Sequence, residues 1–318
     1  MSVIGYFVSS EEHSGTELLK GAVLAERAGF PALWVSDHYH PWLAEQGESP
    51  FVWSALGAIA AATSNVRCAT AVTCPTVRIH PAVIAQAAAT TQELFGGRFD
   101  LGVGTGEALN EHILGDGWPR PEARREMLAE AIEIMRALWT GQTLDHDGEH
   151  YVVDNARLFT LPDRPPRVIV SGFGPESIKL AAQVGDGFAT VQPDADAVKA
   201  YRDAGGKGVI QGGVKVCWAD DEGQALKTAH KLWRNESLPG QLAQDLPTYT
   251  HFEQASELVT EQMTKDDHVG LGPDPERHVA AIKPYLAAGF DEVYVSQIGP
   301  DQEGMIDFYQ REVLPRLT

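Results

Sequence analysis

The regular alternation of short apolar runs with helical stretches is the feature that most constrains the fold of this chain. Eight runs are rich in Val and other apolar residues and poor in charge, which is typical of strands buried on both faces. They are Val3–Val8, Ala32–Ser36, Arg67–Ala71, Phe99–Val103, Val168–Ser171, Gly187–Val191, Gly213–Trp218 and Glu292–Ser296. The helical stretches between them include Thr16–Arg27, Pro81–Leu94, Glu122–Leu138 and Pro275–Ala288. Eight strands alternating with helices predict an α/β fold of the (β/α)8 TIM-barrel type rather than an open doubly wound sheet.

The length of 318 residues suits one barrel with additions, so we expect a single domain over residues 1–318. Two segments exceed a minimal barrel. Residues 141–159 have turn residues around Asp147-Gly148 and alternating strand residues after them, which predicts an inserted hairpin. Residues 235–272 are long, polar and interrupted by proline, and they predict an active-site lid or a substrate wall.

The charge of the chain restricts its partners. With 25 Lys and Arg against 44 Asp and Glu, the net charge is −19, which repels nucleic acids and anionic membranes. We therefore expect a small-molecule substrate and neither of those partners. The start, MSVIGYFVSS, lacks the basic residues and apolar run of a signal peptide, and no apolar run is long enough to span a bilayer. Three cysteines without CxxC spacing indicate a reducing compartment, the cytoplasm, and no zinc site.

Polar residues follow the second predicted strand directly, in the order Asp37-His38-Tyr39-His40-Pro41-Trp42. The active site of a barrel lies at the carboxyl ends of its strands, so His38 is placed to act as a general base near pH 7. A structural histidine bonded to a loop carbonyl is the alternative. His38 and His40 have metal-ligand spacing, but no third ligand stands nearby, so no metal is predicted. Trp42 either borders a substrate pocket or belongs to the core.

Two glycine-rich segments follow other strands at the same predicted rim. Glu107 comes after three alternating glycines that would let a flat ligand approach the backbone. Its carboxyl group could donate a proton there, or it could interact with a helix dipole. The segment GVGTGE is not a dinucleotide fingerprint, because Glu107 occupies the place of the third glycine. Ser171–Pro175, with the sequence SGFGP, predicts either an anion cradle at a helix start or a plain turn with Pro at the first helical position.

Six segments of the first 191 residues together resemble the bacterial-luciferase-like family of flavin and deazaflavin barrels. Within that family they are similar to dehydrogenases that use coenzyme F-420 (F420, 8-hydroxy-5-deazaflavin), namely the glucose-6-phosphate dehydrogenase group and the secondary-alcohol dehydrogenase of methanogens. The segments are IGYFVSSE from Ile4, WVSDHYHPW (Trp34–Trp42), TAVTCPTVRIHPAVIAQAAAT (Thr70–Thr90), GVGTGEALNE (Gly102–Glu111), SGFGP (Ser171–Pro175) and VGDGFATV (Val184–Val191).

The resemblance implies a mechanism and a homodimer. His38 would take the hydroxyl proton of an alcohol while a hydride passes to C5 of the deazaflavin, Glu107 would protonate N1 of the reduced ring, and Trp42 would border the reacting carbon. It also implies a cis peptide at Ala71-Val72 beneath the deazaflavin and a cofactor phosphate held by the SGFGP helix start. The cofactor contacts implied are Asp37, Ala71, Val72, Thr105, Gly106, Asn110, Ser171, Gly172, Phe173, Gly174 and Val191.

One departure from the family bears on the substrate. The sugar-phosphate enzymes grip the substrate phosphate with three basic side chains, and the matching positions here are Asp194, Ala243 and Asp266. Acidic replacements repel phosphate, so we predict oxidation of an uncharged alcohol. Replacement cations remain conceivable at Lys215, Arg234 and Lys265. The alternatives are an F420-dependent sugar-phosphate dehydrogenase and, second, an FMN-dependent luciferase-like monooxygenase.

Overall fold

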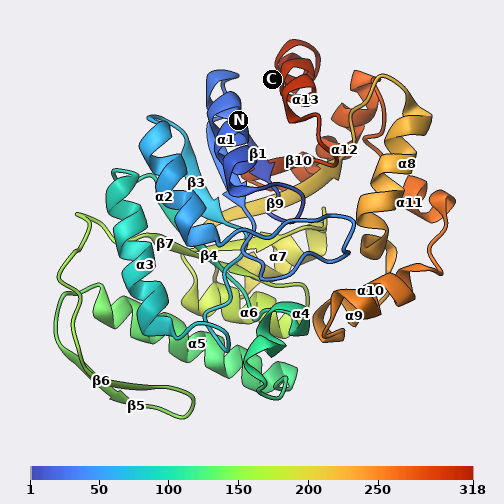
Figure 1. The fold of residues 1–318 in the computed structure, drawn as a ribbon. Coiled ribbons are helices and arrows are strands. Elements are labelled where there is room, and N and C mark those ends of the chain that lie inside the picture. The colour runs from blue at the N-terminus through green and yellow to red at the C-terminus, as the bar shows by residue number, and fades with distance from the viewer. Residues whose placement is uncertain (1, 318) are drawn as a thin grey trace.

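The computed structural model describes residues 2–317, and eight parallel strands close into a barrel surrounded by helices (Figure 1). Strand β1 pairs with both β10 and β2, which completes the circle. The predicted TIM barrel is therefore confirmed. The barrel strands are β1 Val3–Val8, β2 Ala32–Val35, β3 Arg67–Thr70, β4 Phe99–Val103, β7 Arg167–Ser171, β8 Gly187–Thr190, β9 Val209–Val216 and β10 Glu292–Gln297.

The seventh barrel strand, β9, begins at Val209, so the predicted start at Gly213 is wrong. The sequence is misleading because a polar residue and two glycines interrupt the apolar run. Gln211 faces the barrel interior, where it bonds to Trp34 Nε1 at 3.1 Å and to Glu292 at 2.8 Å. A Cβ on Gly212 would collide with Tyr285 and Phe290, and one on Gly213 with Trp34. Aromatic rings from distant elements thus leave room only for glycine at positions 212 and 213 of this strand.

Helices cover the outside of the barrel, and several begin or end at recognisable signals. Ser14 forms a capping box with Glu17 at the start of α1, and Gly289 ends α12 with a φ of 93°. The helices are α1 Gly15–Arg27, α2 Val52–Ala62, α3 Pro81–Leu94, α4 Ala108–Glu111, α5 Pro121–Leu138, α6 Pro175–Val184, α7 Ala195–Asp203, α8 Glu222–Trp233, α12 Pro275–Ala288 and α13 Gln302–Phe308. Of the helices in residues 2–317, none has both the length and the apolar character needed to cross a bilayer.

Side chains fill the interior of the barrel. Its apolar layer consists of Phe7, Ala32, Trp34, Ala69, Ile169, Ala189 and Tyr294. The rings of Trp34 and Tyr294 stack at 4.4 Å, and an Arg67–Glu292 ion pair of 2.7 Å lies at the amino ends of the strands. Because the interior is packed, the carboxyl rim is the end at which a ligand can meet the barrel.

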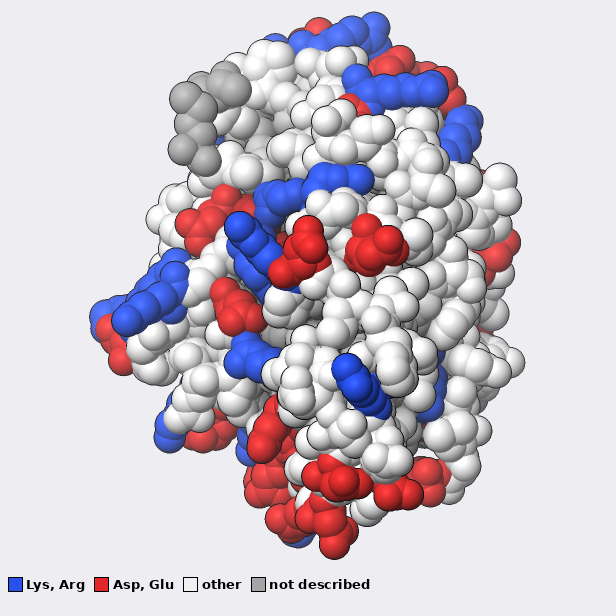
Figure 2. Space-filling view, turned by 90° about the vertical axis from the view of Figure 1, so that its left-hand side faces the viewer, with Lys and Arg blue, Asp and Glu red and all other residues white. Residues whose placement is uncertain are grey.

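Both insertions have structure of their own. Strands β5 (Leu144–Asp147) and β6 (Val152–Ala156) form an antiparallel hairpin beside α5, at the lower left of Figure 1. The second insertion, residues 235–272, contains three short helices: α9 Leu242–Asp245, α10 Tyr249–Ser256 and α11 Glu261–Asp267. We call it the lid. Figure 2 shows the face over α2, α3 and the hairpin, where broad uncharged areas lie above a group of acidic side chains.

Candidate active site

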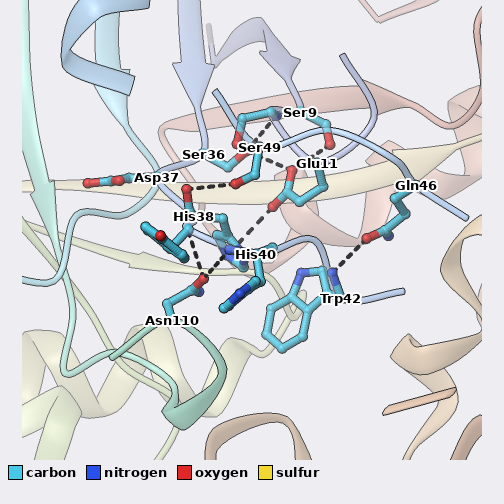
Figure 3. Close-up of polar contacts among 12 residues, drawn as sticks. Ser9, Glu11, Ser36, Asp37, His38, His40, Trp42, Gln46, Ser49 and Asn110 are labelled. Atoms are coloured by element: carbon cyan, nitrogen blue, oxygen red, sulfur yellow. Dashed lines mark hydrogen bonds and ion pairs between the residues drawn. The ribbon is translucent and has the colours of Figure 1, made fainter. Parts of the chain in front are cut away.

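The His38 imidazole lies beyond the end of β2 and faces the carboxylate of Glu11 (Figure 3). Its Nε2 is 3.5 Å from Glu11 Oε1, and its Nδ1 is 3.2 Å from the backbone carbonyl of His40. A carbonyl oxygen only accepts, so Nδ1 carries the proton and the lone pair of a neutral imidazole is on Nε2. His38 is only 9% exposed. The arrangement presents a buried base whose protonated form has a carboxylate beside it.

Glu11 follows β1 and is a functional candidate that no sequence motif singled out. It is 3% exposed and accepts hydrogen bonds from the hydroxyls of Ser9 at 2.6 Å and Ser36 at 2.8 Å. Burial raises the pKa of Glu11, but the charges of His38 and Lys215 and the two hydroxyl bonds outweigh burial, so its pKa lies below the usual value. Glu11 is therefore a fixed carboxylate at neutral pH. Its position after a barrel strand predicts a place at the rim, but its role follows only from the imidazole that it faces.

Trp42 stands between His38 and the lid. Its ring centroid is 5.0 Å from that of His38 and 5.1 Å from that of Phe252 on α10. The Trp42 backbone N–H donates to Gln46 Oε1 at 2.8 Å, which holds the loop (Figure 3). The lid thus contacts the side chain that stands next to the candidate base, and its role as a substrate wall stays a prediction.

Asn110 ties the loop after β2 to α4. Its Oδ1 accepts from the backbone N–H groups of Tyr39 at 2.8 Å and His40 at 3.1 Å. Its Nδ2 is buried and has no acceptor within residues 2–317. A buried donor without a partner costs ~1–3 kcal/mol, so this atom is suited to bind an acceptor on a ligand. His40 is held by the Leu109 carbonyl, 3.0 Å from its Nδ1.

Asp37 is directed into the protein. Its two oxygens accept from the Thr73 hydroxyl at 2.8 Å and from Arg78 at 2.9 Å. Arg78 also donates its backbone N–H to Glu111 at 2.6 Å. Burial raises the pKa of Glu111 to about 7 despite Arg78. These charges lie behind the loops and fix them. Each Asp37 oxygen already accepts one hydrogen bond from the protein, and its contact with a cofactor stays a prediction.

The three glycines before Glu107 are required by packing. A Cβ on Gly102 would lie 1.9 Å from the Thr70 carbonyl oxygen, and one on Gly104 would lie 2.8 Å from Val72. Gly106 has a φ of 77°, and a Cβ there would lie 2.4 Å from Cys74 Sγ. The packing of β3 and the loop after it therefore explains why these positions are glycine, and the approach of a ligand to their backbone stays a prediction. The Ala71-Val72 peptide is cis, as expected.

Glu107 precedes α4 at the N-cap position, but its side chain makes no capping hydrogen bond. It is half-buried, as is Thr105. The Glu107 carboxyl group is therefore free of a capping bond at the rim, and its place at the start of α4 keeps the interaction with the helix dipole as the alternative.

The SGFGP segment begins α6, with Gly174 as an N-cap that supplies no side-chain hydrogen bond. A Cβ on Gly172 would lie 2.8 Å from the Cβ of Ser177, so Gly172 allows the turn to pack against the helix. Phe173 is 57% exposed and Val191, after β8, is 43% exposed. Backbone N–H groups of the helix start beside exposed apolar side chains suit a ligand with an anionic and a flat apolar part. Together with Asn110 Nδ2, they fit a phosphate-bearing heteroaromatic cofactor.

Comparison with known proteins places this geometry in a family. The family model described as luciferase-like monooxygenase matches residues 3–292. An F420-dependent glucose-6-phosphate dehydrogenase of Nocardia farcinica is 35% identical over 332 residues and one of Kribbella flavida is 36% identical over 331. The alignments cover 99% of this chain in both cases, and 97% and 98% of the relatives.

Solved structures agree. An F420-dependent secondary alcohol dehydrogenase, in complex with an F420-acetone adduct, superposes with a TM-score of 0.91 at 28% identity, and 98% of each chain is covered. The coenzyme F420 dependent tetrahydromethanopterin reductase of Methanopyrus kandleri, at 20% identity and a TM-score of 0.80 over 100% of this chain and 99% of that one, shares the fold. The resemblance predicted from the motifs is confirmed, and the chain belongs to the luciferase-like monooxygenase family.

Proposed function

We propose that this protein is a coenzyme F420-dependent dehydrogenase that oxidises a hydroxyl group to a carbonyl. The observation that carries the proposal is the buried His38–Glu11 pair beside Trp42 at the barrel rim. The names of the relatives support F420 as the cofactor and a hydroxyl as the group oxidised. The FMN-dependent monooxygenase alternative is supported at the level of the fold, by monooxygenase structures with sequence identities of 20%, 17%, 17% and 15%.

Bound F420 would supply the acceptor for the hydride that leaves the alcohol carbon. His38 Nε2 would accept the hydroxyl proton, and the Glu11 carboxylate would stabilise the imidazolium that results. Trp42 and the lid would exclude water from the reacting carbon. Glu107, with no bond to the helix it precedes, would hold the proton that the reduced ring takes up at N1.

The residues that would hold F420 lie on the loops after β3, β4, β7 and β8. Asn110 would donate from Nδ2, and the start of α6 would bind the phosphate. Asp37 would act through Thr73 and Arg78, which occupy its oxygens. The remaining contacts would be Ala71, Val72, Thr105, Gly106, Ser171, Gly172, Phe173, Gly174 and Val191.

We propose an uncharged alcohol as the substrate. Of the three positions that match a phosphate grip, Asp194 caps α7 by accepting from Asp196 and Ala197, Ala243 is uncharged, and Asp266 is exposed on α11. The three candidate replacement cations are all paired with carboxylates: Arg234 with Glu45 at 3.2 Å, Lys265 with Glu222 at 2.9 Å, and Lys215 with Glu236. Glucose 6-phosphate is the alternative, favoured by the names of the curated relatives.

Two measurements test the proposal. Titration with F420 and with FMN, followed by fluorescence quenching, should show tighter binding of F420; equal or tighter binding of FMN would contradict it. Turnover with F420 should then favour 2-propanol or a larger cyclic alcohol over glucose 6-phosphate in kcat/KM. A higher value for glucose 6-phosphate than for every neutral alcohol would establish the sugar-phosphate alternative.

We also propose that the protein is a cytoplasmic homodimer. Cys68, Cys74 and Cys217 are free and buried, which suits a reducing compartment. The face in Figure 2 has broad uncharged areas, and exposed apolar side chains on α3 and the hairpin segment include Val83 and Phe159. Sedimentation equilibrium tests the dimer, and a monomeric mass at micromolar concentration would reject it.

A further inference from the structure

Lys215 is a cation inside the barrel at the level of the rim. Residues at alternate positions of a strand share a face. Gln211 of β9 bonds to Trp34 in the barrel interior, and a Cβ on Gly213 would collide with the Trp34 ring, so both positions face inward. Lys215 is the next residue of that face, two positions nearer the carboxyl rim. Its Nζ lies 4.0 Å from the centroid of the Trp233 ring and 6.0 Å from that of Phe7.

Lys215 lies close to the candidate catalytic groups. Its charge lowers the pKa of Glu11, the carboxylate that faces His38. Trp42 and Trp233, whose ring lies against the Lys215 ammonium, belong to the same apolar cluster. A substrate held between His38 and Trp42 would therefore lie within the electric field of Lys215.

The lid brings Glu236 to this cation. Glu236 forms an ion pair with Lys215, whose side chain is 15% exposed. Nε2 of His268, at the other end of the lid, lies 3.6 Å from the Glu236 carboxylate and has no hydrogen-bond partner within residues 2–317. The charge of Lys215 also lowers the pKa of Glu11 and opposes the rise in the pKa of Glu12 that burial causes, so both carboxyl groups lie within its electric field. The Lys215 ammonium therefore lies among the carboxyl groups of Glu236, Glu11 and Glu12.

We infer that Glu236 is a specificity-determining residue, which neutralises Lys215 and so restricts the substrate to uncharged alcohols. This inference rests on the proposed function and deepens it. With the carboxylate in place, a phosphate entering the rim would have to displace Glu236 from Lys215 and lie beside it, which repels the anion. Without the Glu236 carboxylate, Lys215 loses its ion-pair partner and keeps only the nearby Glu11 and Glu12, so its ammonium at the edge of the pocket can bind a phosphate group of the substrate.

The test compares two substrates that share one secondary hydroxyl, propane-1,2-diol and its 1-phosphate ester. The measured quantity is the kcat/KM of the ester divided by that of the diol, with F420 as acceptor. Glu236→Gln should raise this ratio roughly tenfold or more, because a charge-assisted contact is gained and a repulsive group is lost. Adding Lys215→Met to Glu236→Gln should remove the gain.

Glu45→Gln is the matched control. It removes a carboxylate that pairs with Arg234, two residues from Glu236, and should leave the ratio unchanged. An unchanged ratio in a folded Glu236→Gln protein that binds F420, or a wild-type preference for the phosphate ester, would overturn the inference.

A binding measurement does not depend on turnover. Calorimetry of the F420-loaded proteins with inorganic phosphate should show tighter binding to Glu236→Gln and weaker binding to Lys215→Met than to wild type. If neither diol nor ester is oxidised but this order holds, the proposed reaction fails and the assignment of Glu236 stands. Equal phosphate binding by all three proteins would refute the assignment.

Discussion

Glu11 Oε1 lies 3.5 Å from His38 Nε2, and both side chains are nearly inaccessible to solvent although they lie on the loops after two different barrel strands. Glu11 is fixed in turn by Ser9 and Ser36. The His40 carbonyl orients the imidazole through Nδ1, and a carboxylate fixed beside Nε2 stabilises the protonated form of the ring. The pair therefore supports catalysis through His38, and Glu11 is a positioning residue.

The first prediction concerns His38. His38→Ala should lower kcat by ~100- to 10,000-fold, because a general base of this kind supplies that factor. F420 affinity should change little, since the side chain bonds only to the loop and to Glu11. Steady-state kinetics and an F420 titration check both points. A variant that keeps most of the wild-type rate would show that another group takes the proton.

The second prediction separates Glu11 from His38. Glu11→Gln keeps the shape of the side chain but removes its charge, so kcat should fall by roughly tenfold to a hundredfold while KM changes little. Glu11→Asp keeps the charge and should restore part of the lost rate, which a purely steric role would not explain. Equal rates in the Gln variant and the wild type would remove Glu11 from the mechanism.

The third prediction concerns the proton on the reduced cofactor. Glu107→Gln should slow alcohol oxidation, with a loss of the same order as for His38→Ala, because the reduced ring loses its proton source. The half-buried carboxyl group makes no capping bond, so the unfolding temperature should stay near that of the wild type. An unaffected rate constant for F420 reduction in a stopped-flow experiment would contradict this role.

Much of this site could be predicted because the carboxyl ends of barrel strands meet at one rim, so the fold alone places His38, Glu107 and Ser171 at that rim. Glu11 could not be found in the same way, since a lone carboxylate after a strand gains meaning only from the imidazole it faces. The start of β9 was missed because Gln211 and Gly212 are explained by rings remote in sequence. The Lys215–Glu236 pair depends on where the lid packs. The lid sequence has no hydrophobic periodicity from which that position could be predicted.

The fourth prediction tests the glycine packing. Gly106→Ala should destabilise the protein by ~2–4 kcal/mol, because a positive φ and a contact of 2.4 Å with Cys74 Sγ act together. Gly115→Ala is the control: its φ is 84° but nothing lies within 4 Å of the added Cβ, so it should cost only ~1–2 kcal/mol. Urea unfolding measures both. Equal losses would mean that the loop moves aside and that the Cys74 contact is unimportant.

The last prediction separates the two roles of the Asn110 amide, the hydrogen bonds that Oδ1 accepts and the unpartnered donor Nδ2. Asn110→Asp keeps an oxygen for the N–H groups of Tyr39 and His40 but replaces the unpartnered donor Nδ2 with a second acceptor. F420 binding should weaken at least ~10-fold, since one hydrogen bond is lost and an acceptor is left buried against the ligand. Thermal unfolding should shift little. Asn110→Ala removes both Oδ1 and Nδ2, so it should reduce the affinity for F420 and also lower the free energy of unfolding by ~1–3 kcal/mol. If Asn110→Asp bound F420 as tightly as the wild type while Asn110→Ala remained destabilised, the side chain would serve only to hold the loop, and the cofactor would take its hydrogen bonds elsewhere on the rim.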